Sequence, residues 1–139
     1  MICIVRMGLV FLLFALSQVG CVERRAFNNT AFPKAFSVDG FNLIKIGTPV
    51  NEALDILGPP LSCDAYGYPA YSSHKLPPLP SGRLFDAVPL QNIGSYSTKD
   101  DVVLVLSYSR AKNGSRDHFM FCLDVFKGAI VNKIQFIAD

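Results

Sequence analysis

The last third of the chain constrains the fold most, because it carries a strand pattern between two turn signals. In residues 118–125 every second position is a large apolar residue, namely Phe119, Phe121, Leu123 and Val125. Alternation with a period of two is typical of a strand with one buried face. Residues 102–108 are a continuous β-prone run, which predicts a strand buried on both faces or nearly so.

Two dipeptides mark the ends of the central strand. Asn113-Gly114 and Lys127-Gly128 can both adopt the positive φ angles that tight hairpin turns require. After the second turn, the pattern predicts a third strand with Ile130, Ile134 and Phe136 on its buried face. The sequence therefore predicts a three-stranded antiparallel β-meander.

The pattern before the meander favours one or two short helices. Residues 41–46 are apolar enough for a short helix or a strand, and the sequence does not decide which. The next helix is clearer, with Thr48 as its cap, Pro49 in its first turn and Gly58 as its stop. Its apolar face would consist of Val50, Ala53, Leu54 and Leu57. Packing such helices on one face of the meander predicts an α+β fold.

A proline-rich excursion spans residues 62–101 and is predicted to be loop-like. Residues 76–80 read Leu-Pro-Pro-Leu-Pro, which favours a polyproline II conformation. One interpretation is a recognition motif for an aromatic groove, and the other is a stiff excursion on the surface of the domain.

The first twenty residues have the layout of a signal peptide. Arg6 precedes a dense apolar run in residues 7–16, which is too short for a membrane span of about 20 apolar residues. Residues 21–36 are polar and without clear periodicity, so they are interpreted as an extended, lipidated tether. The compact domain would occupy residues 37–139.

Gly20-Cys21 closes the apolar run and resembles the lipobox of bacterial lipoproteins. In that class the cysteine sulfur takes a diacylglycerol and becomes the mature N-terminus. Gln18 stands where the class usually has leucine. The resemblance implies lipidation of Cys21, and the alternatives are ordinary cleavage near Gly20 or an uncleaved anchor. Several acyl chains on one cysteine satisfy the need for more than one chain in stable anchoring.

Leader, helix and meander together resemble the SmpA/OmlA (BamE-like) family of outer-membrane lipoproteins. The residues that carry the resemblance are Ile46-Gly47, Glu52-Ala53, residues 57–60 and the last hairpin, residues 125–131. Within them, the family motif falls on Gly47, Glu52, Leu57, Gly58 and Pro60, where it is structural. The resemblance implies the small α+β fold that this family shares with β-lactamase-inhibitor proteins. The excursion at residues 62–101 is longer than the family's.

The same resemblance implies a location at the outer membrane, facing the periplasm. It also implies other envelope proteins as partners, among them a β-barrel assembly complex. The sequence adds no signal for nucleic acid, because the formal net charge is only +2 and the basic residues are scattered. No metal-ligand spacing, phosphate-binding loop or cofactor motif is present, so no metal and no cofactor are expected.

Candidate catalytic groups are few. Cys63 with His74, or Cys122 with His118, could be drawn as a nucleophile and base, but no local signature supports either pair. Asp100-Asp101 and Asp124 could be the carboxylates of an acid–base pair, but Asp100-Asp101 is more typical of a solvated turn before a strand. We therefore expect a protein that is not an enzyme.

Cys63 and Cys122 have a second interpretation. If Cys21 is lipidated and Cys3 is removed with the leader, these two thiols remain in an oxidising compartment, where they could form a disulfide. Two separate buried thiols are the alternative, and the sequence leaves the choice open.

The functional hypothesis is a membrane-anchored, non-catalytic envelope lipoprotein that acts as a protein-binding scaffold, in outer-membrane assembly or integrity. The alternative is a secreted or periplasmic binding or inhibitor module of the same fold, with the excursion as its binding loop. A small envelope hydrolase is the third and weakest hypothesis.

Overall fold

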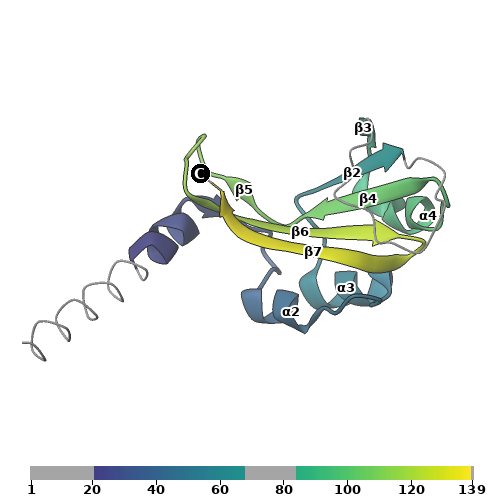
Figure 1. The fold of residues 1–139 in the computed structure, drawn as a ribbon, viewed down its shortest axis with the longest axis horizontal. Helices are drawn as coiled ribbons and strands as arrows, with labels where there is room; N and C mark the ends of the chain where they lie inside the picture. The colour runs from purple at the N-terminus through teal and green to yellow at the C-terminus, as the bar shows by residue number, and fades with distance from the viewer. Residues whose placement is uncertain (1–20, 68–83, 139) are drawn as a thin grey trace, which may run out of the picture.

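The computed structural model describes residues 21–67 and 84–138 (Figure 1). Its main element is a five-stranded antiparallel sheet with the strand order β3-β2-β4-β6-β7. The strands are β2 (Ser62–Gly67), β3 (Leu84–Ala87), β4 (Val102–Ser107), β6 (His118–Phe126) and β7 (Ala129–Ala138). A two-stranded sheet pairs β1 (Thr30–Ala31) with β5 (Arg110–Ala111). The predicted signal peptide and residues 76–80 lie outside the described part.

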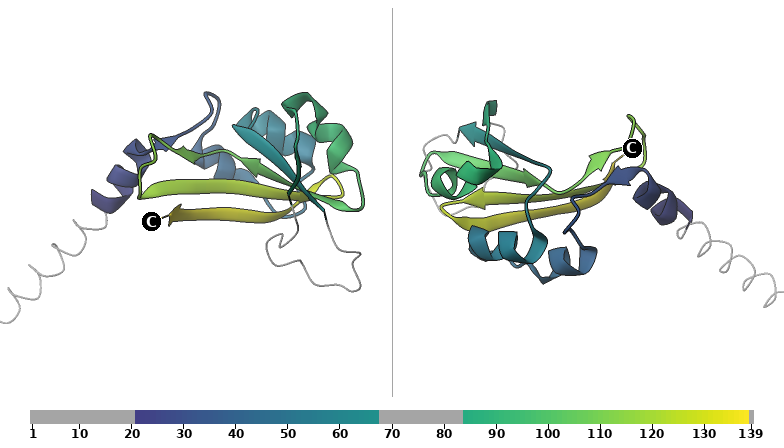
Figure 2. Two further views of the ribbon diagram at one scale, coloured as in Figure 1. Left: turned by 90° about the horizontal axis from the view of Figure 1, so that it is seen from above. Right: turned by 180° about the vertical axis from the view of Figure 1, so that it is seen from behind.

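Short helices cover one face of the large sheet. They are α2 (Val38–Leu43), α3 (Val50–Leu57), the 3-10 turn η1 (Leu90–Asn92) and α4 (Ile93–Ser97). Figure 2 shows α2, α3 and α4 on the same side of the sheet. Ser37 caps α2, because its hydroxyl oxygen accepts a hydrogen bond from the Gly40 N–H at 3.0 Å. Of the ambiguous residues 41–46, residues 41–43 belong to this helix and residues 44–46 lie beyond its end.

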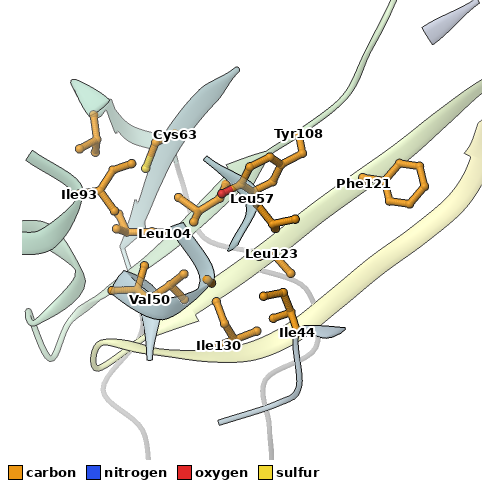
Figure 3. Packing of buried hydrophobic residues seen from close by; sticks show 14 of the residues in the cluster. Ile44, Val50, Leu57, Cys63, Ile93, Leu104, Tyr108, Phe121, Leu123 and Ile130 are labelled. Atoms are coloured by element: carbon orange, nitrogen blue, oxygen red, sulfur yellow. The ribbon is translucent and has the colours of Figure 1, made fainter. Parts of the chain in front are cut away.

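The hydrophobic core lies between this helical layer and the sheet (Figure 3). Ile44, Val50 and Leu57 from the helical side meet Leu104, Leu123 and Ile130 from the strands, and all are buried. The α+β fold is therefore confirmed in its broad form. Both turn predictions are confirmed as well, since Asn113, Gly114, Lys127 and Gly128 all have positive φ angles.

The prediction of a loop-like excursion over residues 62–101 is wrong for residues 62–67, which form β2, and for residues 84–97, which contain β3, η1 and α4. β2 lies between β4 and β3, so the predicted meander of β4, β6 and β7 is part of a larger sheet. Cys63 and Ala65 alternate inward along β2 and are buried. In addition, α4 places Ile93 in the core. The many prolines and glycines of this region obscured these short elements.

The predicted cap of α3 is also corrected. Pro49 occupies the N-cap position and makes no side-chain capping bond. The Thr48 hydroxyl instead accepts a hydrogen bond from the Lys45 N–H at 3.1 Å, which closes the preceding turn. Gly58 ends the helix with a φ of 72°, as expected, and its N–H donates to the Leu54 carbonyl at 2.8 Å.

The predicted buried face of the third strand is only partly right. The register between β6 and β7 shifts by one residue between Asp124 and Val125, which leaves Val131 as the extra residue of a β-bulge. Ile130 therefore faces the core, whereas Ile134 and Phe136 lie on the opposite face, and Phe136 is 52% exposed. A shift of one residue exchanges the two faces of a strand, and no sequence signal marked it.

The interpretation of residues 21–36 as an extended tether is wrong. Residues 21–28 are helical, and the chain then enters β1. Ala26 and Thr30 are buried, and Phe32 and Phe36 pack against the core. This segment is therefore an integral layer of the domain, which begins well before residue 37.

Candidate functional site

A groove lies between the helical residues 21–28 and the large sheet. Its volume is about 640 Å³. Apolar side chains line it from three directions: Phe27 from the helical segment, Val38 from α2, and Phe119 with Phe121 from β6. The polar residues that line it are Glu23, Arg24, Asn28 and Gln135. An apolar lining with a few polar groups is the usual composition of a binding site for an organic ligand or a peptide side chain.

Hydrogen bonds fix the helical segment on the sheet. The Thr30 hydroxyl donates to the Ala26 carbonyl at 2.6 Å and accepts from the Phe119 N–H at 2.8 Å. Thr30 is buried, so one side chain joins the end of the helix to β6. Asn29 adds side-chain bonds to the carbonyls of Arg116 and Asp117. The groove is therefore bounded by a wall with defined attachments to the sheet.

Aromatic rings form a continuous chain from the groove into the core. The centroid of Phe27 lies 5.1 Å from that of Phe32 and 6.2 Å from that of Phe119. Phe119 in turn lies 5.6 Å from Phe121. Phe27 remains 50% exposed. An exposed aromatic ring held by other rings loses little conformational freedom on binding, which favours it as an interface anchor.

Cys21, the predicted lipidation site, is exposed and has a free thiol at the start of the helical residues 21–28. The same helix forms one wall of the groove. The eight residues of such a segment span about 12 Å at 1.5 Å per residue. The predicted attachment point and the groove are therefore neighbours on one rigid element, a relationship that the sequence did not predict.

The possible disulfide between Cys63 and Cys122 is contradicted by the strand register. Cys63 pairs with Leu106 on β4, whereas Cys122 pairs with Ser107. Neighbouring positions on β4 face opposite sides of the sheet, so the two thiols do too. They also lie on β2 and β6, two strand spacings apart or roughly 10 Å, beyond the reach of a disulfide. Both cysteines are free and buried, in agreement with the alternative of separate thiols.

Neither buried thiol has the environment of a nucleophile. Burial raises the pKa of Cys63 to about 12, with a further contribution from Asp64. The pKa of Cys122 is raised by burial, although a hydrogen bond with Ser107 opposes the shift. Reactive cysteines have lowered pKa values instead. Both thiols are therefore buried structural residues, Cys63 in the core and Cys122 on the opposite face of the sheet.

The candidate base His118 does not meet Cys122. The two residues are four positions apart on β6, which separates them by about 13 Å. His74, the other candidate, lies outside the described residues. Asp100 and Asp101 are exposed next to β4, and Asp100 lies 3.9 Å from the ammonium of Lys127. Among the described residues, neither Cys122 with His118 nor the two aspartates form a catalytic arrangement, and the Cys63–His74 pair lies partly outside those residues.

The family-motif residues are dispersed and support the backbone. Gly47 has a φ of 92°, and its N–H donates to the Ile130 carbonyl at 2.7 Å. Glu52 is exposed in the first turn of α3, and Leu57 is buried in the core. Gly58 offers its carbonyl to the Tyr108 hydroxyl at 3.1 Å. Pro60 is buried. These residues do not line the groove.

The sequence analysis named Asp124 as a possible acid–base carboxylate, but it did not predict the polar cluster around this residue on the sheet face opposite the helices. Asp124 is 3% exposed; one of its carboxylate oxygens accepts a hydrogen bond from Asn132 at 3.1 Å, and the other has no hydrogen-bond partner. Burial raises the pKa of Asp124. Tyr66 lies close enough for its pKa to be raised by burial and then by Asp64, Asp124 and Cys122. The alternating position of Asp124 on β6 was the available signal.

Within residues 21–67 and 84–138, no group of three or more His, Cys, Asp or Glu side chains is arranged to hold a metal ion. Across the same ranges, no helix combines the length and the apolar character that crossing a membrane requires.

Comparisons with known proteins return no relative. No protein-family model matches the chain, and neither a curated protein nor a solved structure gives a match. The resemblance to the SmpA/OmlA family therefore stays a prediction that depends on the motif residues and on the leader.

Proposed function

We propose that this chain is a membrane-anchored, non-catalytic envelope lipoprotein that binds partner proteins through the groove. One observation carries the proposal: the wall of the groove is the helical segment 21–28, which contains Cys21, the predicted lipidation site. Acyl chains on Cys21 would hold this helix at a membrane surface. The groove would then face partners that lie on or in the same membrane.

The lining of the groove supports a protein partner. Its half-exposed Phe27 is an anchor of the kind that dominates interface energies, and polar residues surround it. Glu23 and Arg24 supply both signs of charge at the groove, which can orient a partner without requiring a strongly charged one. The raised pKa values of Cys63 and Cys122 weigh against the hydrolase hypothesis.

Within this proposal, the finer fold assignment follows the SmpA/OmlA resemblance. It is supported by α3, which ends at Gly58 before two prolines, and by the β6–β7 hairpin with its turn at Lys127-Gly128. The proposed location is the periplasmic side of the outer membrane, and the proposed partners are envelope proteins, among them the β-barrel assembly complex.

The anchor is tested by metabolic labelling with a palmitate analogue, which should label the wild-type chain but not Cys21→Ser. An unlabelled wild type would remove the anchor and favour the secreted binding or inhibitor module. That alternative assigns binding to the excursion. Its deletion test should be restricted to residues 76–83, because Leu84–Ala87 form β3 and pair with β2.

The groove is tested by Phe27→Ser, with Leu43→Ser as the matched control. Leu43 is 68% exposed on α2 and is not among the residues that line the groove. Phe27→Ser should reduce co-purification of β-barrel assembly subunits and increase outer-membrane permeability, whereas Leu43→Ser should do neither. Equal effects of the two variants, or no co-purification with the wild type, would refute the assignment of the groove.

A further inference from the structure

The outer edge of β7 is only partly occupied. At the start of the strand, residues 47–49 run alongside it, with the Gly47 N–H donating to the Ile130 carbonyl at 2.7 Å and the Ile130 N–H donating to the Thr48 carbonyl at 2.8 Å. Pro49 and Ala129 form an antiparallel bridge there. Beyond this contact, no described residue hydrogen-bonds to the backbone of β7 on that side. Figures 1 and 2 show β7 as the outermost strand.

The backbone groups that point outward can be identified from the register. Phe121 directs both its groups away from β7: its carbonyl accepts from the Tyr108 N–H at 2.8 Å and its N–H donates to the Ser109 hydroxyl at 2.7 Å. Strand residues alternate in direction, so the neighbours of Phe121 bond to β7 through Ile134 and Phe136. The outward N–H and C=O groups of β7 therefore belong to Lys133, Gln135 and Ile137.

Natural edge strands are protected by prolines, exposed lysines, inward-pointing charges, β-bulges or a covering element. On β7 the bulge at Val131 lies at the inner end of the strand, and the stretch beyond it carries little of this protection. Residues 131–138 contain no proline and a single charged residue, Lys133. The Lys133 ammonium donates hydrogen bonds to the Phe41 and Ile44 carbonyls, at 2.7 Å from each. Its charge therefore lies at the end of α2 and does not prevent a strand from pairing with the edge. A long, nearly uncharged edge of this kind is expected to have a strand as its partner.

We propose that the partner is a second copy of the same chain, with the two β7 strands paired antiparallel about a two-fold axis at Gln135. The free stretch, residues 132–138, is centred on Gln135, so this register uses all of it. The end of each strand reaches the position where residues 47–49 of the other copy begin, and does not overlap them. Each outward-facing pair, Gln135 with Gln135 and Lys133 with Ile137, exchanges two hydrogen bonds.

Side chains match in this register. Phe136, which is 52% exposed, lies directly opposite Ile134 of the second copy. An aromatic residue opposite a β-branched residue is one of the favourable cross-strand pairs. Lys133 lies opposite Ile137, so no like charges oppose each other. Because Gln135 also lines the groove, the two grooves lie beside the axis. The pairing itself requires neither the anchor nor the proposed partner of the groove.

Charge-swap variants test this register. Gln135 is exposed, so charged residues there leave the fold intact. In Gln135→Lys or Gln135→Glu, like charges oppose each other across the axis and should weaken the dimer by up to about fivefold. Mixing the two variants opposes unlike charges and should restore dimers. Gln91→Lys, on the exposed η1 turn, is the matched control and should dimerise like the wild type. Native mass spectrometry of the full chain, released from detergent micelles, measures the dimer fraction.

Gln135→Pro provides a second test. The Gln135 N–H points away from β6. Proline in both copies therefore removes both hydrogen bonds of the Gln135 pair in the dimer and none within the monomer. The expected result is a monomer with an unchanged thermal unfolding midpoint. A wild-type chain that stays monomeric at high concentration, single charge variants that dimerise like the wild type, or mixtures that fail to restore dimers would overturn the proposal. A monomeric wild type that captures the strand of another protein would also overturn it.

Discussion

The ammonium of Lys133 donates a hydrogen bond to the Phe41 carbonyl at 2.7 Å and lies 4.9 Å from the centroid of the Phe41 ring. The same ammonium donates to the Ile44 carbonyl at 2.7 Å. These carbonyls are at the C-terminal end of α2, where a positive charge is favoured. The Phe41 carbonyl also accepts a hydrogen bond from the Ile44 N–H at 3.2 Å. One side chain from β7 therefore fastens α2 to the sheet.

Replacing Lys133 with methionine should destabilise the domain. The stem of the side chain keeps its volume, but the carbonyls of Phe41 and Ile44 lose a charged donor. The free energy of unfolding should fall by about 1–2 kcal/mol. Urea unfolding followed by circular dichroism measures the change, with Lys34→Met at an exposed position as the control. An equal effect of both substitutions would show that the capping role is negligible.

Gly58→Ala should destabilise the folded domain. Gly58 has a φ of 72°, and a Cβ atom there would lie 2.7 Å from the Cβ of Ala35. Strain and steric overlap together should lower the free energy of unfolding by about 1–3 kcal/mol. Gly94→Ala is the matched control, because nothing lies within 4 Å of the added Cβ and the residue is in α4. If the two variants unfold at the same urea concentration, the strain at Gly58 is not significant.

Asp124 should make the domain more stable in acid than a surface carboxylate would. Burial raises the pKa of Asp124, although the hydrogen bond from Asn132 opposes the shift. The folded chain therefore binds this proton more tightly than the unfolded chain, and the stabilisation is lost as the pH rises through the raised pKa. Asp124→Asn should remove this pH dependence and increase stability at neutral pH. Unfolding from pH 3 to pH 8 measures it, with Asp55→Asn on the exposed side of α3 as the control. Parallel profiles for wild type and Asp124→Asn would contradict the assignment.

The thiols of Cys63 and Cys122 should be reduced and unreactive in the folded chain. Burial raises the pKa of Cys63 to about 12, so almost no thiolate exists at neutral pH. Alkylation followed by peptide mass spectrometry should show both cysteines modified only at the rate of unfolding. In a chain expressed without lipidation, the exposed Cys21 serves as the internal control. A Cys63–Cys122 disulfide in the oxidised chain would contradict the register of β2, β4 and β6.

Period-two alternation was sufficient to predict β6, a continuous β-prone run to predict β4, and turn residues to predict both tight turns. These signals are local: Phe119 and Phe121 alternate, and Lys127-Gly128 permits positive φ angles. β2 was not predictable in this way, because its inward residues, Cys63 and Ala65, are small and its partner β4 is distant in sequence. The same applies to the bulge at Val131, which depends on how β7 pairs and not on its composition.

The candidate site was harder to predict than the fold. Residues 21–28 carry charges and little periodicity, so their helical structure depends on tertiary contacts such as the two hydrogen bonds of Thr30. The groove combines this segment with α2, β6 and β7, and its members are separated by most of the chain. Cys21 could be identified from the leader alone. Its position on a wall of the groove could not be predicted, because it depends on how residues 21–28 pack on the sheet.

The bulge at Val131 sets which face the outer half of β7 presents. If the same residues paired without a bulge, Asn132 would lie opposite Leu123, Ile134 and Phe136 would turn toward the helices, and Lys133 would leave the end of α2 for the solvent. The amide groups available to a neighbouring strand would then be those of the even-numbered residues. Deletion of Val131 itself leaves Asn132 opposite Asp124 and Lys133 opposite Leu123, so related chains with a one-residue gap at this position should keep both the core and the outward-facing amide groups.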